Sequence, residues 1–147
     1  MSSRSLNKAE AATADRRALM FRNPGALLFV GDGHAAQGDG ELTGNALETS
    51  MDWTFTVDVI RGLSIQNPRL ENGDYWMASG IANSLPEALQ AATTNLSRFL
   101  EEQYKLNANE IGIVLGTAIR YNIGELVDPL VHVVASIEKR SLSRIGK

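Results

Sequence analysis

Ser84-Leu85-Pro86-Glu87 opens the stretch of sequence that decides the fold. Ser84 can accept hydrogen bonds from the free amides of a helix start, Pro86 suits the first turn, and Glu87 completes a capping box. One apolar stripe follows at helical spacing, formed by Leu85, Ala88, Leu89, Ala92, Leu96, Phe99, Leu100 and Tyr104. Such a stripe needs a second layer to cover, so the stretch predicts a long helix that packs on a sheet.

A second helix is expected directly after the first, beginning near Asn107 or Asn109. Its buried face is expected to consist of Ile111, Val114, Leu115, Ala118 and Ile119. Asn122 and Gly124 then predict the end of this helix, because both residues favour helix stops. Two sequential helices joined by a short turn are therefore predicted.

Strands are expected on both sides of the helices. Residues 131–137 are typical of a closing strand, and residues 74–80, which follow Asn-Pro and Asn-Gly turn signals, are typical of another. Residues 47–59 alternate between apolar and polar side chains, which predicts a long strand, or two joined by a bend, with one face buried. The apolar run 26–30 predicts a short buried strand. The expected fold class is α+β, an antiparallel twisted β-sheet covered on one face by two sequential helices.

The composition is that of one globular domain, with 147 residues of which 44% are apolar and 21% charged. A net charge of −3 does not indicate that the chain binds nucleic acid or an anionic membrane. The chain has no cysteine, which excludes disulfides and a thiolate nucleophile and suits a cytoplasmic protein. We expect a polar leader without a signal peptide over residues 1–22, the domain over 23–140 and a solvated tail over 141–147.

The candidate site is the glycine-rich segment, Gly31-Asp32-Gly33-His34-Ala35-Ala36-Gln37-Gly38-Asp39-Gly40-Glu41. If the backbone stays extended, Asp32 and His34 point to the same side, and Asp39 and Glu41 repeat this relation. A glycine-permissive turn would let both pairs converge on zinc or another divalent ion, which could polarise a carbonyl and activate water. The alternative is ordinary turn chemistry, with aspartate capping its own loop and His34 hydrogen-bonded in place.

Further residues are candidates for the same site. Glu48 lies on the polar face of the alternating strand and is a candidate ligand or general base. His132 is the second of two histidines. It is either an exposed or hydrogen-bonded residue of the closing strand, or it lies in the candidate site together with Asp128. Thr49 or Ser50 as nucleophile is a weaker alternative, because neither is followed by a lysine or histidine at an informative spacing.

The glycine-rich segment, preceded by Pro24-Gly25-Ala26-Leu27 and followed by Gly44 and Glu48, resembles the signature of the acetamidase/formamidase family. The resemblance covers about residues 22–140 and continues in residues 46–52, 80–89, 127–129 and 132–135. Members of that family hydrolyse small amides such as formamide and acetamide to the acid and ammonia. Typical members are much longer, and this sequence is similar only to their C-terminal portion.

The resemblance implies a metal-dependent hydrolase of small amides, with zinc as the expected ion. We assign Asp32, His34 and Glu41 as metal ligands, Asp39 and Glu48 as catalytic residues, and Gln37 and His132 as substrate-binding residues. Glu48 would shuttle a proton between the attacking water and the leaving ammonia, and Asp39 would complete or orient the metal shell. The expected partner is a second copy or a separate chain that supplies the missing portion. The alternative is a truncated, non-catalytic relative that acts as a metal-binding or assembly module.

Overall fold

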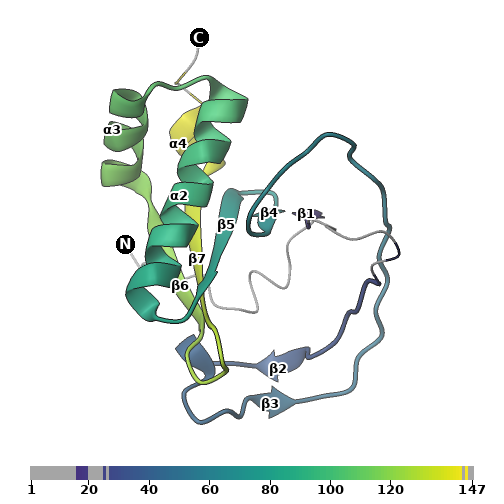
Figure 1. Ribbon diagram of the computed structural model, residues 1–147. Helices are drawn as coiled ribbons and strands as arrows, with labels where there is room; N and C mark the ends of the chain where they lie inside the picture. The colour runs from purple at the N-terminus through teal and green to yellow at the C-terminus, as the bar shows by residue number, and fades with distance from the viewer. Residues whose placement is uncertain (1–15, 20–24, 26, 144, 146–147) are drawn as a thin grey trace.

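The computed structural model describes residues 16–19, 25, 27–143 and 145 (Figure 1). Its strands are β1 (Arg16–Ala18), β2 (His34–Ala36), β3 (Leu47–Glu48), β4 (Arg69–Glu71), β5 (Tyr75–Ala82), β6 (Arg120–Glu125) and β7 (Val131–Glu138). Its helices are the 3-10 turn η1 (Asp39–Glu41), α2 (Leu85–Tyr104), α3 (Ala108–Ala118) and α4 (Lys139–Leu142). Within the described ranges, no helix has the length and apolar character needed to cross a membrane.

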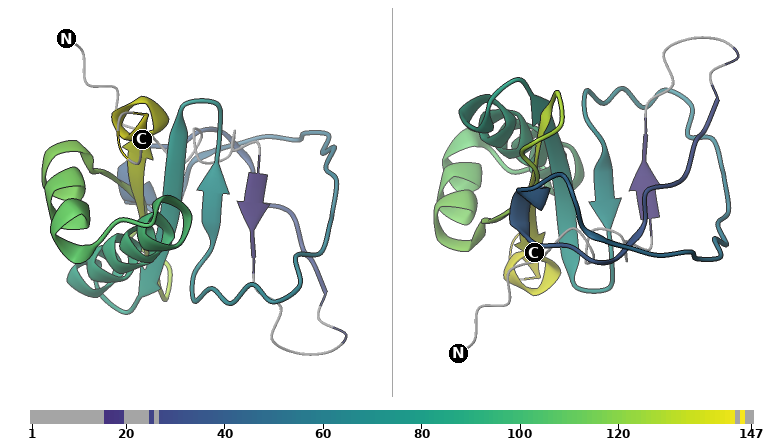
Figure 2. Two further views of the ribbon diagram at one scale, coloured as in Figure 1. Left: turned by 90° about the horizontal axis from the view of Figure 1, so that it is seen from above. Right: turned by 90° about the horizontal axis from the view of Figure 1, so that it is seen from below.

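The main sheet has five antiparallel strands in the order β1-β4-β5-β7-β6. Helix α2 packs across β5 and β7, and α3 lies beside it, as Figures 1 and 2 show. Ile111 and Val114 of α3 join the same buried cluster as Leu96 and Leu100 of α2 and Val133 of β7. The predicted architecture, an antiparallel sheet covered on one face by two sequential helices, is confirmed.

The starts of both helices follow from local side-chain chemistry. Ser84 is the N-cap of α2: its Oγ accepts a hydrogen bond from the Glu87 amide at 3.4 Å and donates to Glu87 Oε2 at 3.0 Å. Asn107 caps α3, and its side chain and that of Glu110 form a full capping box. At the end of α2, Lys105 adopts a left-handed conformation with φ 57°. The predicted helix starts are thus confirmed.

Gly80 of β5 sets how closely α2 approaches the sheet. A Cβ atom built at this position would lie 2.0 Å from the Ala88 carbonyl oxygen and 2.2 Å from the Ala92 amide nitrogen. Both atoms belong to the helix backbone, so a change of side-chain rotamer cannot relieve the overlap. Ala88 and Ala92 are also fully buried. Small residues on both layers therefore permit a contact between backbones.

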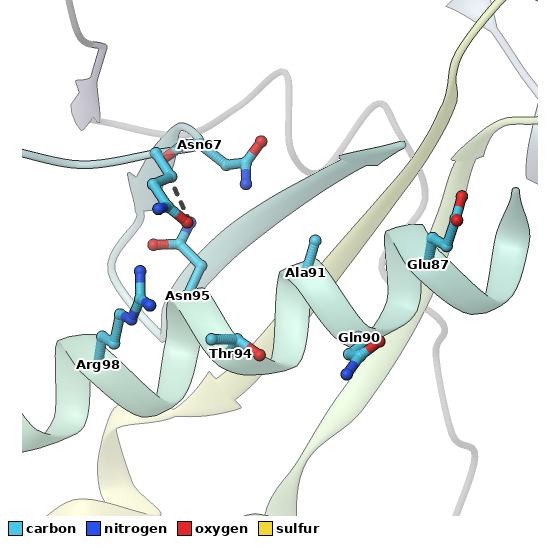
Figure 3. A pocket seen from close by; sticks show the side chains of 8 residues that line it. Asn67, Glu87, Gln90, Ala91, Thr94, Asn95 and Arg98 are labelled. Atoms are coloured by element: carbon cyan, nitrogen blue, oxygen red, sulfur yellow. Dashed lines mark hydrogen bonds between the residues drawn. The ribbon is translucent and has the colours of Figure 1, made fainter. Parts of the chain in front are cut away.

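Asn95 of α2 ties the helix to the segment that precedes β4, within the pocket shown in Figure 3. Its Nδ2 lies 3.2 Å from each of three carbonyl oxygens, those of Asn67, Pro68 and Ser79. Its Oδ1 accepts a hydrogen bond from Arg69 Nε at 3.2 Å, and the residue is only 5% exposed. Both polar atoms of this buried amide have partners, which makes it a structural crosslink.

Asn95→Leu is expected to lower the free energy of unfolding by about 2 kcal/mol, because it removes the donor that three carbonyl oxygens share and the acceptor of Arg69 Nε. Thr94→Ala, at the exposed neighbouring position in the same pocket, should change this free energy by less than about 0.5 kcal/mol. Urea denaturation followed by circular dichroism measures both changes. Equal effects of the two substitutions would contradict the crosslinking role.

The predicted strand over residues 47–59 is wrong beyond Glu48. Only Leu47 and Glu48 pair, with Ala36 and His34 of β2 respectively. Residues 49–60 form no strand and are exposed. Alternation provides the side-chain pattern of a strand, but a strand also needs a neighbour to accept its backbone hydrogen bonds. The buried strand predicted at 26–30 is wrong for the same reason over 27–30, and Ala26 lies outside the described residues.

Asn122 and Gly124 do not end a helix, which corrects a second prediction. Helix α3 already ends at Ala118, and Asn122 and Gly124 lie within the edge strand β6. The pairing of β6 with β7 shifts register around Gly124. A Cβ at Gly124 would lie 3.0 Å from His132 Nδ1 on β7. The glycine therefore serves a bulge and a close side-chain contact, which produce the same sequence signal as a helix stop.

The structure extends the predicted domain at both ends. Residues 16–18, in the predicted leader, form β1 and pair with β4, whereas residues 1–15 lie outside the described part of the chain. The tail predicted to be solvated contains Leu142, which is 1% exposed and belongs to the core cluster. Helix α4 follows β7 directly and buries this apolar side chain, and such burial stabilises the fold.

Candidate functional site

The glycine-rich segment lies against β6, the edge strand of the main sheet (Figure 1). The backbone amide of Leu126 donates to the carbonyl oxygen of Gly40 at 3.0 Å. Gly40 is buried with φ 73°, and a Cβ there would lie 2.7 Å from Leu126 Cδ1. Glycine is therefore required at this position both for the left-handed backbone and for the contact.

Two side-chain hydrogen bonds also join the segment to β6. Gln37 Nε2 donates to the Gly124 carbonyl oxygen at 3.0 Å, and Asn122 Nδ2 donates to Asp39 Oδ1 at 3.3 Å. Asn122 is 5% exposed, and among the described residues its Oδ1 has no hydrogen-bond partner. The segment is thus fixed to the sheet by its side chains as well as by its backbone.

Asp32, His34 and Glu48 each place one potential ligand atom within 4.8 Å of the others. His34 Nε2 lies 3.3 Å from Asp32 Oδ1 and 3.1 Å from Glu48 Oε1. The register of β2 and β3 pairs His34 directly with Glu48, and Asp32 has a left-handed φ of 58°. The His34 side chain is 4% exposed, whereas those of Asp32 and Glu48 are 77% and 71% exposed. A buried imidazole therefore lies beneath two solvent-facing carboxylates.

Gln37 fixes the orientation of the His34 ring. Because Gln37 Nε2 donates to the Gly124 carbonyl, its Oε1 is the atom that faces His34 Nδ1, at 3.0 Å. A side-chain carbonyl can only accept, so Nδ1 carries a proton. Nε2 then faces Asp32 and Glu48 with either a second proton, as in imidazolium, or a lone pair that can bind a cation.

The surroundings raise the pKa of His34 above its usual value. The hydrogen bond to Gln37 is the largest cause, and burial of the ring opposes it. The negative charges of Glu48, Asp32 and Glu41 act in the same direction as Gln37. The protonated ring is favoured as a result, and a bound cation would compete with the proton on Nε2.

Gln37→Met is expected to lower the pKa of His34, because methionine keeps the side-chain length but loses the strong acceptor. Because the pKa of His34 is higher in the folded than in the unfolded protein, protonation of the ring stabilises the fold. This stabilisation is complete below the unfolded pKa of about 6.5 and is lost as the pH rises through the folded pKa. As the pH rises through this interval, the free energy of unfolding should therefore fall more in the wild type than in Gln37→Met. An NMR titration of His34 with urea denaturation at matched pH measures both, and an unchanged pKa in Gln37→Met would contradict the prediction.

The structure brings together part of the predicted ligand set. Asp32 and His34 lie in the cluster, and the third position belongs to Glu48, which was predicted as a catalytic residue. Glu41, the third predicted ligand, lies outside this cluster at the end of η1 and acts on His34 through its charge. The β2–β3 register is the cause, because it places Glu48 opposite His34.

His132 and Asn122 lie on the strands beside the segment. His132 Nε2 lies 3.0 Å from Ser79 Oγ, and its Nδ1 approaches Gly124, whose carbonyl holds Gln37. A substrate-binding role for His132 stays a prediction. Sequence reasoning missed the contact of Asn122 with the site because Asn122 and Gly124 were interpreted as a helix stop. The sequence signal for this contact is the polar amide of Asn122 within a strand, because a buried amide needs hydrogen-bond partners.

The Acetamidase/Formamidase family model matches residues 21–128 of the chain. No curated protein matches it. Among solved structures, the acetamidase from Yersinia enterocolitica is 34% identical and aligns with a TM-score of 0.82, over 87% of this chain and 39% of its own. The residues that the family model matches include the whole glycine-rich segment and Glu48.

Two further structures share the fold. A predicted acetamidase/formamidase from Thermoanaerobacter tengcongensis is 24% identical, with a TM-score of 0.63 over 77% of this chain and 38% of its own. An acetamidase from Bacillus halodurans is 23% identical, with a TM-score of 0.55 over 78% and 39%. The chain thus spans about two fifths of the length of each of these three structures.

Proposed function

Because the chain belongs to the acetamidase/formamidase family, we propose that it hydrolyses small aliphatic amides of the formamide or acetamide type to the carboxylic acid and ammonia. The observation that supports this most directly is the cluster of Asp32, His34 and Glu48, whose ligand atoms lie within 4.8 Å of one another. Amides hydrolyse slowly in water, and a divalent ion held by such a cluster is a common way to accelerate the reaction.

The donor set fits a divalent metal ion, for which zinc is our proposal. One imidazole nitrogen and two carboxylate oxygens are usual zinc ligands, and three protein ligands leave a position for water or substrate. Zinc–ligand bonds of about 2.0–2.2 Å place neighbouring ligand atoms of a tetrahedral site about 3.3–3.6 Å apart. The separations from His34 Nε2, 3.3 Å to Asp32 and 3.1 Å to Glu48, are close to this spacing.

The remaining steps fall to side chains of this chain. When bound, the ion would polarise the amide carbonyl and lower the pKa of a water molecule. Asp32 and His34 would hold such an ion, and the hydrogen bond from Nδ1 to Gln37 would leave the lone pair of His34 Nε2 available to it. Glu48 contributes one oxygen to the cluster, and its solvent-facing carboxylate takes a proton from the attacking water and returns it to the leaving nitrogen. Asp39, held by Asn122, orients the turn beside the cluster.

Ammonia release from formamide and from acetamide by the purified chain tests this proposal, with the metal content determined on the same sample. We expect release that stops after chelation and returns with added zinc. Release that persists in the chelated protein would overturn the metal role. A folded, zinc-loaded chain that releases no ammonia from either amide, alone or with the polypeptide described below, would overturn the amidase assignment.

A second candidate function is that of a non-catalytic module for metal binding or assembly. It is favoured by one observation, that the chain spans 39% of the Yersinia enterocolitica acetamidase. In this version the cluster binds zinc but supports no hydrolysis. Under either function we propose that the chain works as a homo-oligomer or together with a partner chain that supplies the part of the acetamidase fold that it does not span.

A further inference from the structure

Residues 49–60, here called the apolar arm, carry exposed apolar side chains at every second position. These are Met51 (41% exposed), Trp53 (43%), Phe55 (57%), Val57 (60%) and Val59 (74%). The positions between them hold Asp52, Thr54, Thr56 and Asp58. In Figure 1 the arm runs from β3 away from the main sheet as a long ribbon without strand pairing. The arm has the side-chain pattern of a strand and lacks its neighbours.

A second exposed apolar run accompanies the arm. Residues 27–30, which lead into the glycine-rich segment, are between 41% and 84% exposed. The arm contacts the chain just after this run, at Gly33, where an added Cβ would lie 2.5 Å from Met51 Sδ and 2.8 Å from Trp53 Cζ2. Gly33 stands between Asp32 and His34 in the sequence. The exposed apolar surface therefore begins beside the candidate metal cluster.

Such a surface is suited to strand addition. An extended segment with unpaired backbone groups can accept a further strand through main-chain hydrogen bonds, and alternating side chains then bury one face against it. Monomeric proteins rarely expose contiguous apolar patches of this kind without a partner. The surface therefore calls for a polypeptide that supplies both a strand and apolar side chains.

The likeness to the Yersinia enterocolitica acetamidase indicates which polypeptide this is. The compact part of this chain, residues 69–142, makes up about half of its length, yet 87% of the chain aligns with a TM-score of 0.82. Because 87% of this chain aligns, the alignment reaches beyond the compact part into the residues that precede it. About three fifths of that acetamidase lies beyond the aligned part, since 39% of it is covered.

We propose that the apolar arm and residues 27–30 dock against a partner polypeptide with the fold of the acetamidase portion that this chain does not span. Docking orders the arm by strand addition and encloses the solvent-facing carboxylates of Asp32 and Glu48. The partner thus forms a wall of the substrate pocket. This proposal rests on the family and on the exposed arm, and it holds whether or not the assembled site hydrolyses amides.

Co-expression tests the docking. The tagged full chain is produced together with the unaligned portion of the Yersinia enterocolitica acetamidase, and the purified product is analysed by light scattering and hydrogen exchange. We expect a one-to-one complex in which the amides of residues 51–60 exchange at least about 10-fold more slowly than in the chain alone. A chain that forms a dimer with itself and protects the same amides would overturn the proposal in favour of a second copy.

A pair of charge-matched variants tests the docking face. Phe55→Asp with Val57→Asp places two charges on the apolar side of the arm, and Thr54→Asp with Thr56→Asp places two on the other side. The first pair should weaken the complex at least about 10-fold and the second less than about 2-fold. All four positions are exposed, so the chain itself should fold, which circular dichroism checks. Equal effects of the two pairs would overturn the strand-addition mode.

A single-chain version covers the case in which the acetamidase portion is insoluble by itself. This chain replaces the aligned portion within the full-length Yersinia enterocolitica acetamidase. A chimera that unfolds in one cooperative transition, and loses that cooperativity with Phe55→Asp and Val57→Asp, supports the proposal. A chimera whose two parts unfold independently overturns it. Neither readout depends on ammonia release, so docking and the amidase function can fail separately.

Discussion

Gly80→Ala is expected to lower the free energy of unfolding by about 3 kcal/mol. The added methyl group would lie 2.0 Å from the Ala88 carbonyl oxygen and 2.2 Å from the Ala92 amide nitrogen. Both are backbone atoms in the interior of α2, so the helix must move away from β5 as a unit. That movement separates Leu96 and Leu100 from the sheet, which adds a loss of buried contacts to the steric cost. Urea denaturation followed by circular dichroism measures the change.

Gly112→Ala in α3 is the matched control, because it adds the same methyl group to a glycine with open surroundings. Apart from its chain neighbours and the backbone of its own helix, no atom of the described residues lies within 4 Å of a Cβ built at Gly112, and the position is exposed. Alanine in a helix interior is more favourable than glycine, so this variant should gain about 0.5–1 kcal/mol. A Gly80→Ala protein as stable as the wild type would mean that α2 and β5 do not approach as closely as described.

The helical half of the fold could be predicted because its signals are local. Ser84 and Asn107 carry the caps of α2 and α3 in their own side chains, and the apolar stripe of α2 lies within a single element. The closing strand β7 could be predicted for a related reason, since it is a short run rich in β-branched residues, of which Val133–Ile137 are buried. In each case, the residues that decide the structure are close in sequence.

The predictions that differ from the structure depend on pairing partners that are not close in the sequence. Residues 47–59 have the alternation of a strand, but whether a strand forms depends on a neighbour that the described residues do not provide. The position of the third candidate ligand depends on a similar point. Spacing along the segment favoured Glu41, whereas the pairing of β2 with β3 brings Glu48 to His34. A cross-strand register is not encoded in the spacing of residues within one strand.

Glu48→Gln is expected to weaken zinc binding at least about 100-fold, more than the loss of an outer hydrogen bond would. Glu48 Oε1 lies 3.1 Å from His34 Nε2, slightly closer than two ligand atoms of one tetrahedral zinc ion, and the neutral amide is a poor substitute for the carboxylate as a ligand. The side chain is 71% exposed, so the substitution should leave the stability of the fold unchanged. Competition with a chromophoric chelator measures the affinity.

Glu41→Gln removes the same charge from the same neighbourhood and separates coordination from long-range electrostatics. Glu41 lies outside the cluster of ligand atoms, and its charge acts on His34 from a distance. We expect a loss of about 3-fold or less, because solvent screens a charge that does not contact the ion. If Glu41→Gln instead costs as much as Glu48→Gln, both carboxylates coordinate and the segment closes around the metal. If Glu41→Gln alone weakens binding, the ligand set inferred from spacing, Asp32, His34 and Glu41, is correct, and Glu48 forms only an ion pair with His34.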